Sequence, residues 1–405
     1  MKILYVHQYF MTPEEDGATR SYWLARKLVE QGHQVIMITS TNTLLHKEPA
    51  VCGIDGIKVV YVKNEYDNYF SKLRKVRSFL QFMYRSIQVA GKEKNIDLVF
   101  ATSTPLTVGI VALYLKFRKK WKYVFEVRDL WPEFPIQIGA IRNKLLIGLL
   151  RFFERKIYQK AEFVIALSPG MEDGVKATGI PAEKVCVIPN MSKPDLFFPR
   201  EKSKEMMEKY FSGVSKFRIV HFGAMGVANG LEYIIEAAKV LWQQGIEDVE
   251  FVLLGYGSTE PELKRMCRDY DLKNVVFLGP HNLYATSEIV NCCDASITSF
   301  KNLPILYTNS PNKLFDSLSA GKPVIVNSAG WTKQLVEEND CGFYVDPENP
   351  GDLAEKIRRY KGNRLLLQRW GENARRLSEQ VYDKSILSEK FVRVLERIGT
   401  ENQKN

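Results

Sequence analysis

Short runs of aliphatic and β-branched residues alternate with amphipathic stretches of helical period along nearly the whole chain. Such alternation is typical of parallel sheets that are covered by helices on both faces. The first half of the chain is predicted to hold strands at 3–7, 35–39, 58–62, 98–101, 123–126, 163–166 and 185–188. The second half is predicted to hold strands at 218–222, 250–254, 275–278, 295–299, 323–327 and 342–345.

The two halves are separated by a segment rich in turn-forming residues, 189–216, which we interpret as a linker. A chain of 405 residues is long enough for two or three domains that each bury a core. We expect one domain at 1–199, a second at 200–378, and a C-terminal crossover helix and tail at 379–405. The predicted fold is α/β, with two Rossmann-like, doubly wound lobes that face a cleft and a last helix that crosses back.

Positive charge is distributed unevenly. The chain has 57 Lys and Arg against 47 Asp and Glu, and the whole excess lies in residues 1–199. Three segments, 71–94, 116–122 and 141–160, together hold 18 basic and 2 acidic residues. Because apolar residues alternate with the cations in 71–94 and 141–160, both are predicted as basic amphipathic helices that contact an anionic membrane surface. A core-packed helix with a solvated cationic face is the alternative.

Other composition signals narrow the class of protein. Nucleic acid is not expected as a partner, because no known nucleic-acid-binding motif accompanies the cations. The six cysteines show no pairing pattern, which favours a reducing cytoplasm over a disulfide framework or a zinc site. Residues 98–115 carry no charge and imitate a membrane span, but Thr102-Ser103-Thr104-Pro105 interrupts them. A strand, loop and helix of a buried α/β unit is predicted there instead.

The most informative stretch is 307–327. Ser310 is predicted to cap a helix that has Pro311 at its first position and closes at Gly321. The free N–H groups of the first turn, including that of Asn312, and the helix dipole suit a diphosphate. Lys313 would add a cation there, and the carboxylate of Asp316 could accept two ribose hydroxyls. The alternative is a capped helix with a surface lysine and aspartate.

Two glycine-containing turns follow predicted strands of the second half. Gly223 and Asn229 lie in the first turn, and Gly255 and Gly257 lie in the second. Glycine lets the backbone approach a phosphate closely, and open α/β sheets bind ligands at the carboxyl ends of their strands. The full G-x-G-x-x-G pattern is missing at both turns, which counts against a dinucleotide-dependent dehydrogenase.

Short motifs that carry a family resemblance follow one another along residues 1–398. They are Gly17-Ala18-Thr19-Arg20, Gly32-His33-Gln34-Val35, Val187-Ile188-Pro189-Asn190, Leu254-Gly255-Tyr256-Gly257, Val276-Phe277-Leu278-Gly279 and Lys313-Leu314-Phe315-Asp316. Through these motifs the chain resembles the retaining, nucleotide-sugar-dependent glycosyltransferases of the family 4 or group 1 type, which have the GT-B fold. Residues 125–133, with 103–107 before them and 310–313 after them, resemble the WbuB-like subgroup in bacterial surface-polysaccharide assembly.

The resemblance implies a hexosyltransferase that is peripheral on the cytoplasmic face of the plasma membrane. It would move a sugar from a nucleotide diphosphate to a polyprenyl-diphosphate-linked glycan in polysaccharide or O-antigen synthesis. The donor would be UDP-linked, and the subgroup hints at an N-acetylated deoxy-amino sugar such as N-acetylfucosamine. Retention of configuration follows from the same analogy, and no metal or other cofactor is expected to be required.

The site residues only partly match the family. Asp316 stands where the family has a ribose-binding glutamate, but the first acid of its pair is replaced by Thr308. Ala224 and Asn229 replace a customary Arg and Lys that bind phosphate. We therefore hypothesise that Lys313 or Arg128 supplies the missing positive charge at the departing diphosphate.

The first lobe offers candidate acceptor residues. Arg128 and Asp129 follow the strand at 123–126, and Asp129 would orient the acceptor hydroxyl or accept its proton. Trp131 would offer a flat face to a sugar. Gly17 and Arg20, after the first strand, would reach the donor phosphates from across the cleft. Two further candidates are His7, which could equally be a packed core-edge histidine, and Asp269-Tyr270-Asp271, which we interpret as a solvated turn and not as a metal site.

Two alternatives from other classes remain open. A UDP-sugar epimerase can share the two-lobe fold and would isomerise a sugar without an acceptor. A catalytically degenerate scaffold that binds membranes or nucleic acid would bind without turnover, and the replacements at Ala224, Asn229 and Thr308 favour it.

Overall fold

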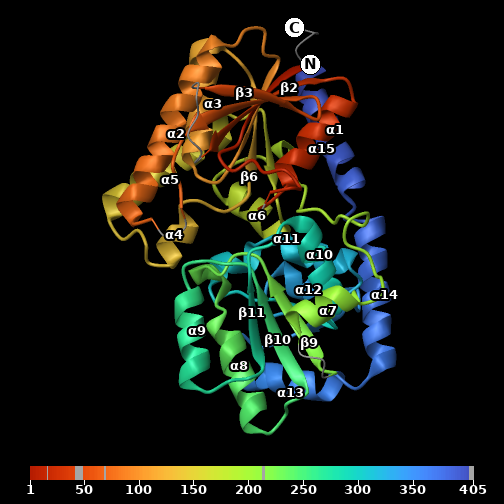
Figure 1. Ribbon diagram of the computed structural model, residues 1–405. Coiled ribbons are helices and arrows are strands. Elements are labelled where there is room, and N and C mark those ends of the chain that lie inside the picture. The colour runs from red at the N-terminus through yellow and green to blue at the C-terminus, as the bar shows by residue number, and fades with distance from the viewer. Residues whose placement is uncertain (16, 42–48, 68–69, 212–214, 401–405) are drawn as a thin grey trace. The chain divides into compact units, whose positions relative to one another are not determined.

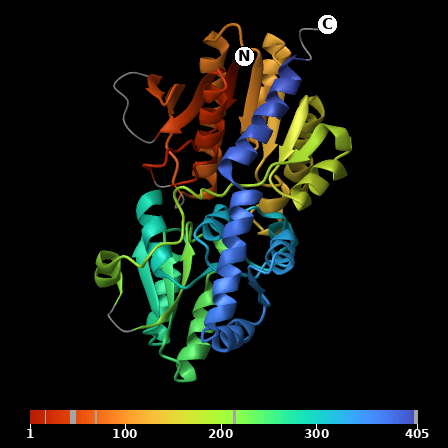
Figure 2. The ribbon, with the colours of Figure 1, turned by 90° about the vertical axis from the view of Figure 1, so that its right-hand side faces the viewer.

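The computed structural model describes residues 1–15, 17–41, 49–67, 70–211 and 215–400. Its contacts divide the chain into two compact units. The first unit comprises Met1–Thr12, Ala18–Pro189 and Ser385–Asn405, and the second comprises Pro13–Gly17 and Asn190–Lys384. Figures 1 and 2 show the two units in two views.

The first unit is built on an eight-stranded sheet of order β3-β4-β2-β1-β5-β6-β7-β8. Its pairs are parallel except β3 with β4. The seven strands predicted in this half are confirmed to within two residues at each end. Their bounds are β1 (Lys2–Val6), β2 (Gln34–Thr41), β4 (Ile57–Lys63), β5 (Leu98–Thr102), β6 (Tyr123–Val127), β7 (Phe163–Ala166) and β8 (Val185–Val187).

Strand β3 (Ala50–Ile54) was not predicted. It is an edge strand whose residues are mostly exposed, so it lacks the apolar run that marks the other strands. It pairs with β4 in a hairpin closed by Asp55 and Gly56, which have φ angles of +46° and +82°. Two adjacent positive φ angles are the geometry of a type I′ turn, and Asp-Gly was its signal in the sequence.

Helices cover both faces of this sheet. Figure 1 shows α2, α3 and α5 along one side of the unit and α1 with α15 along the other. Helix α1 ends before Gly32, whose φ of +80° confirms the predicted glycine stop. Helix α15 packs on the sheet through the ring of Phe391, 4.8 Å from that of Phe100. The helices are α1 (Arg20–Glu30), α2 (Lys72–Lys92), α3 (Thr107–Lys119), α4 (Glu133–Gln137), α5 (Lys144–Lys160), α6 (Pro169–Ala177) and α15 (Lys384–Thr400), with a 3₁₀ turn at Ala182–Lys184.

The predicted buried α/β unit at 98–115 is confirmed as strand β5 followed by helix α3. In the part of the chain that the structure describes, helices fall short of the length and apolar character that crossing a bilayer requires.

The second unit holds a six-stranded parallel sheet of order β11-β10-β9-β12-β13-β14. All six strands predicted in this half are confirmed. They are β9 (Phe217–Phe222), β10 (Val249–Leu254), β11 (Val275–Gly279), β12 (Ala295–Thr298), β13 (Val324–Val326) and β14 (Gly342–Tyr344). The helices are α7 (Lys204–Tyr210), α8 (Glu232–Gln243), α9 (Glu260–Asp269), α10 (Leu283–Cys292), α11 (Asn312–Ser319), α12 (Trp331–Glu338), α13 (Pro350–Tyr360) and α14 (Arg364–Gln380), with 3₁₀ turns at Val227–Asn229 (η2) and Pro304–Thr308 (η3). Two Rossmann-like α/β lobes are therefore confirmed.

The start of α11 differs from the prediction. The helix begins one residue later, so that Pro311 is its cap residue and not its first helical residue. The Ser310 hydroxyl does not cap the helix but accepts a hydrogen bond from the backbone N–H of Asn190, at 3.1 Å. The predicted stop is confirmed, because Gly321 follows the helix with a φ of +61°.

Candidate functional site

Each unit carries a polar cluster at the carboxyl edge of its parallel sheet, which is where open α/β sheets bind ligands. In the second unit the cluster lies after β9 and β10 and at the first turn of α11. In the first unit it lies after β1, β5 and β6.

Lys313 is the centre of the cluster in the second unit. Its ammonium group, Nζ, lies 3.0 Å from Nε2 of His221 and 3.2 Å from Oδ1 of Asn229. Strand β9 supplies His221, η2 supplies Asn229, and the first turn of α11 supplies the lysine. The Lys313 side chain is partly exposed, so a ligand can reach it. Of the predicted site residues, the structure brings Gly223, Asn229 and Lys313 together here.

Desolvation dominates the electrostatics of this cluster. It lowers the pKa of Lys313 to about 7, because the charged ammonium loses water that its neutral partners do not fully replace. Burial, followed by the charge of Lys313, lowers the pKa of His221. The imidazole is therefore neutral at pH 7 and can accept a hydrogen bond from the ammonium.

The glycines of the two turns hold the turns against each other. A Cβ atom on Gly255 would lie 2.0 Å from the carbonyl oxygen of Gly223, and one on Gly257 would lie 2.5 Å from that of Met225. The backbone N–H groups of Gly223 and Gly255 donate to the carbonyls of Leu254 and Gly279. These two donors are thus already used, and the role of the glycines toward a phosphate stays a prediction. Exposed Gly223, with a φ of +110°, leaves room beside Lys313.

Asp316 lies one turn further along α11 and is only 4% exposed. Its carboxylate forms an ion pair with Lys193, a residue that the sequence reasoning did not single out. Burial raises the pKa of Asp316, and Lys193 acts against that rise. The role of Asp316 toward a ribose stays a prediction, and the structure adds that its charge is already neutralised by a buried lysine.

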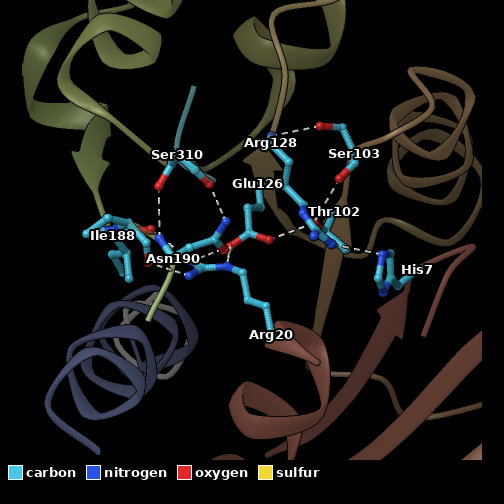
Figure 3. Close-up of polar contacts among 10 residues, drawn as sticks. His7, Arg20, Thr102, Ser103, Glu126, Arg128, Ile188, Asn190 and Ser310 are labelled. Carbon is cyan, nitrogen blue, oxygen red and sulfur yellow. Dashed lines mark hydrogen bonds and ion pairs between the residues drawn. The ribbon is translucent and has the colours of Figure 1, made fainter. Parts of the chain in front are cut away.

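Arg128 is the centre of the cluster in the first unit (Figure 3). Its guanidinium lies 3.0 Å from Nε2 of His7, and its backbone N–H donates to the hydroxyl of Ser103, at 2.9 Å. Since arginine is always a donor, Nε2 of His7 accepts this bond and the histidine is neutral. Burial and then the charge of Arg128 lower the pKa of His7. Burial also raises the pKa of the neighbouring Asp129 to about 6.

Arg20 does not reach outward, which corrects the prediction that it binds donor phosphates. Its side chain is fully buried and donates to the Glu126 carboxylate from Nε and Nη2, at 3.0 and 2.8 Å (Figure 3). It also donates to the carbonyls of Ile188 and Pro189, the last two residues of this part of the unit. Glu126 was missed, although a carboxylate inside the apolar run of β6 is an unusual signal.

The remaining candidates are at least partly exposed, and Asn312 directly precedes Lys313. Gly17 is exposed in the segment Pro13–Gly17, and Asn312 and Trp131 are partly exposed at the starts of α11 and α4. Asp269, the last residue of α9, is paired with Arg265, and Asp271, in the turn before β11, is paired with Lys273; both aspartates are exposed. The interpretation of this motif as a solvated turn is confirmed.

The predicted basic helices leave apolar side chains on the surface. Helix α3 packs between α2 and α5, so the three form one layer on the sheet. We call their outer surface the α2-α3-α5 face. Leu73 and Leu145 are 84% and 86% exposed, and six further large apolar side chains on α2 and α5 are more than 40% exposed. They are Val76, Leu80, Tyr84, Leu146, Leu149 and Phe152; Tyr114 and Phe117 on α3 are exposed as well.

Comparison with known proteins matches both units. The Glycosyl transferase 4-like domain family matches residues 17–191, and the Glycosyl transferases group 1 family matches residues 202–377. The "Probable glycosyltransferase WbjE" of Pseudomonas aeruginosa is 22% identical over 330 residues, which are 80% of each chain. The amylovoran biosynthesis glycosyltransferase AmsK of Erwinia amylovora is 25% identical over 248 residues, 60% of this chain and 58% of AmsK. The structure of HepE from Anabaena in complex with UDP and glucose superimposes with a TM-score of 0.73 at 19% identity, covering 98% of this chain and 99% of HepE.

Proposed function

Because the chain is a glycosyltransferase with a family 4-like domain and a group 1 domain, we propose that it transfers a sugar from a UDP-linked donor to a polyprenyl-diphosphate-linked glycan in polysaccharide or O-antigen synthesis. The name of AmsK, which acts in amylovoran biosynthesis, supports a role in polysaccharide assembly. The HepE complex supports a uridine nucleotide.

The observation that carries the proposal is the environment of Lys313. Cleavage of a sugar–phosphate bond develops negative charge on the departing diphosphate, and a cation aimed at that charge accelerates the step. Nζ of Lys313 lies 3.2 Å from Oδ1 of Asn229. At the position of Asn229 the family has a phosphate-binding lysine that this chain lacks. We propose that Lys313 binds the diphosphate, with the N–H groups at the start of α11 beside it, and that neither a metal nor another cofactor is needed.

We propose that the cluster around Arg128 serves the acceptor. Asp129 orients the acceptor hydroxyl or takes its proton, and its raised pKa of about 6 suits a base that works near pH 7. By analogy with the WbuB-like subgroup, transfer proceeds with retention and the sugar is an N-acetylated deoxy-amino sugar such as N-acetylfucosamine.

Calorimetric titration with UDP, GDP, dTDP, ADP and NAD tests the donor proposal without the acceptor. We expect UDP to bind tightest, and Asp316→Asn to weaken UDP because an amide presents one acceptor oxygen where the carboxylate presents two. Asparagine is preferred to alanine because it leaves Lys193 an acceptor. Asp248→Asn, at an exposed ion pair with Lys361, is the matched control.

Absence of nucleotide binding would contradict the proposal and favour the degenerate scaffold. Isomerisation of a UDP-sugar without an acceptor would favour the epimerase.

We further propose that the protein is peripheral on the cytoplasmic face of the plasma membrane, through the α2-α3-α5 face. Leu73 and Leu145 can insert among acyl chains while the basic residues contact anionic headgroups. This surface suits an enzyme whose acceptor is held in the bilayer by a polyprenyl chain.

Vesicle flotation tests this attachment. The triple variant Lys72→Gln, Lys75→Gln and Arg77→Gln is expected to lower partition onto phosphatidylglycerol-containing vesicles about a hundredfold, because each cation near the surface contributes about 1 kcal/mol. Lys264→Gln, Arg265→Gln and Lys273→Gln in the second unit remove the same charge elsewhere and should leave partition nearly unchanged. Failure of the unmodified protein to float with the vesicles would exclude this attachment.

A further inference from the structure

Lys313 differs in its partners from Lys193 and Lys322, two further lysines of the second unit with little exposure. Lys193 is paired with the Asp316 carboxylate. Lys322 donates to the carbonyls of Asn291 and Cys293, and the nearby Asp294 opposes the lowering of its pKa. Lys313 has a neutral imidazole and an amide oxygen as partners, and desolvation is the cause of its lowered pKa.

The charged groups around Lys313 are engaged elsewhere. His221 on β9 faces it directly and is held neutral by burial. Asp316, on the same helix, pairs with Lys193. Lys301, which packs against Gly230 beyond η2, pairs with Glu232 at the start of α8. The described residues thus place no carboxylate in an ion pair with Lys313, and the positive end of the α11 dipole further disfavours its charged form.

We infer that binding of a diphosphate at this site is accompanied by uptake of one proton, which Nζ of Lys313 receives. The inference rests on the proposed donor site. The lone pair of the neutral amine forms the new N–H bond, and the proton comes from the conjugate acid of the buffer. The diphosphate supplies the anionic partner that the empty site lacks, and the resulting ammonium can donate to its oxygens. His221 and Asn229 act as positioning residues that hold the amine in place.

The inference has a defined pH dependence. With a pKa of about 7 in the empty protein, about 0.9 of Lys313 is neutral at pH 8, so binding at pH 8 should take up about 0.9 proton. As pH rises, a growing fraction of the empty protein must be protonated before it binds. The affinity for UDP should therefore fall about eightfold between pH 7.5 and pH 8.5.

Calorimetry of UDP binding at pH 8 in HEPES and in Tris measures the uptake, because the two buffers differ in ionisation enthalpy. The unmodified protein should take up about 0.9 proton, and Lys313→Arg, whose guanidinium stays charged, should take up almost none. Lys264→Arg, on the exposed side of α9, should behave as the unmodified protein does. Methyl diphosphate serves as a second probe that lacks the nucleoside.

The outcomes separate this inference from the donor proposal. UDP binding without proton uptake, or with the same uptake in Lys313→Arg, would overturn the inference and leave the donor proposal intact. Uptake with methyl diphosphate in the absence of UDP binding would support the inference and overturn the choice of a uridine nucleotide. If neither probe binds, both are overturned. Should Lys313→Arg fold poorly, the eightfold pH effect on the unmodified protein decides, since an unchanged affinity would contradict the inference.

Discussion

Replacing Lys313 with alanine is expected to lower kcat/KM for the UDP-sugar about 10²–10³-fold. The ammonium group of Lys313 lies beside Asn229, which replaces the lysine that the family has at this position. Its interaction with the leaving diphosphate strengthens as charge develops, so kcat should fall together with kcat/KM. Steady-state transfer of labelled sugar measures both constants.

The control for this prediction must separate catalysis from stability. Removal of a desolvated lysine should not destabilise the second unit, because its charged form is already disfavoured there. Thermal unfolding of Lys313→Ala should therefore match that of the unmodified protein. Lys264→Ala, which removes a lysine from the surface of α9, should keep full activity. Unchanged kcat/KM in Lys313→Ala would remove this lysine from the site.

Replacing Glu126 with alanine is expected to destabilise the first unit by about 3–5 kcal/mol. The substitution leaves the guanidinium of Arg20 buried without its counter-ion, and it also removes the acceptor of the Thr102 hydroxyl, at 2.6 Å. Urea unfolding monitored by hydrogen exchange measures the loss in the free energy of unfolding, and peptides of β5 and β6 report on the first unit. Peptides of β9 and β10 in the second unit provide an internal reference.

Two further variants test whether the loss of a buried ion pair causes the destabilisation expected of Glu126→Ala. Glu126→Leu combined with Arg20→Met replaces the buried pair by apolar side chains and should restore much of the lost stability. Glu133→Ala breaks the exposed pair with Arg151 and should cost less than about 1 kcal/mol. If Glu133→Ala destabilised the protein as much as Glu126→Ala does, burial of the Arg20–Glu126 pair would not explain the effect of Glu126→Ala.

The arrangement of strands and helices could be predicted from the sequence because it follows from local periodicity. Each buried strand, such as β5 and β9, needs a run of apolar side chains, and each loop needs turn formers. The edge strand β3 could not be predicted in this way, because most of its side chains are exposed and it has no apolar run. The same local signals located the loop after β6, which holds Arg128, and helix α11, whose first turn holds Lys313.

The partners of those polar side chains were decided by the tertiary structure alone. Arg20 and Glu126 are 106 positions apart, and Lys193 and Asp316 are 123 apart. Whether a charged residue faces a ligand or a buried counter-ion depends on which distant side chain the fold brings within hydrogen-bonding distance. Periodicity records how each segment buries its own face, and it contains no information on such pairs. For this reason the sequence predicted that Arg20 binds phosphate, whereas in the folded protein Arg20 is a buried cation that is paired with Glu126.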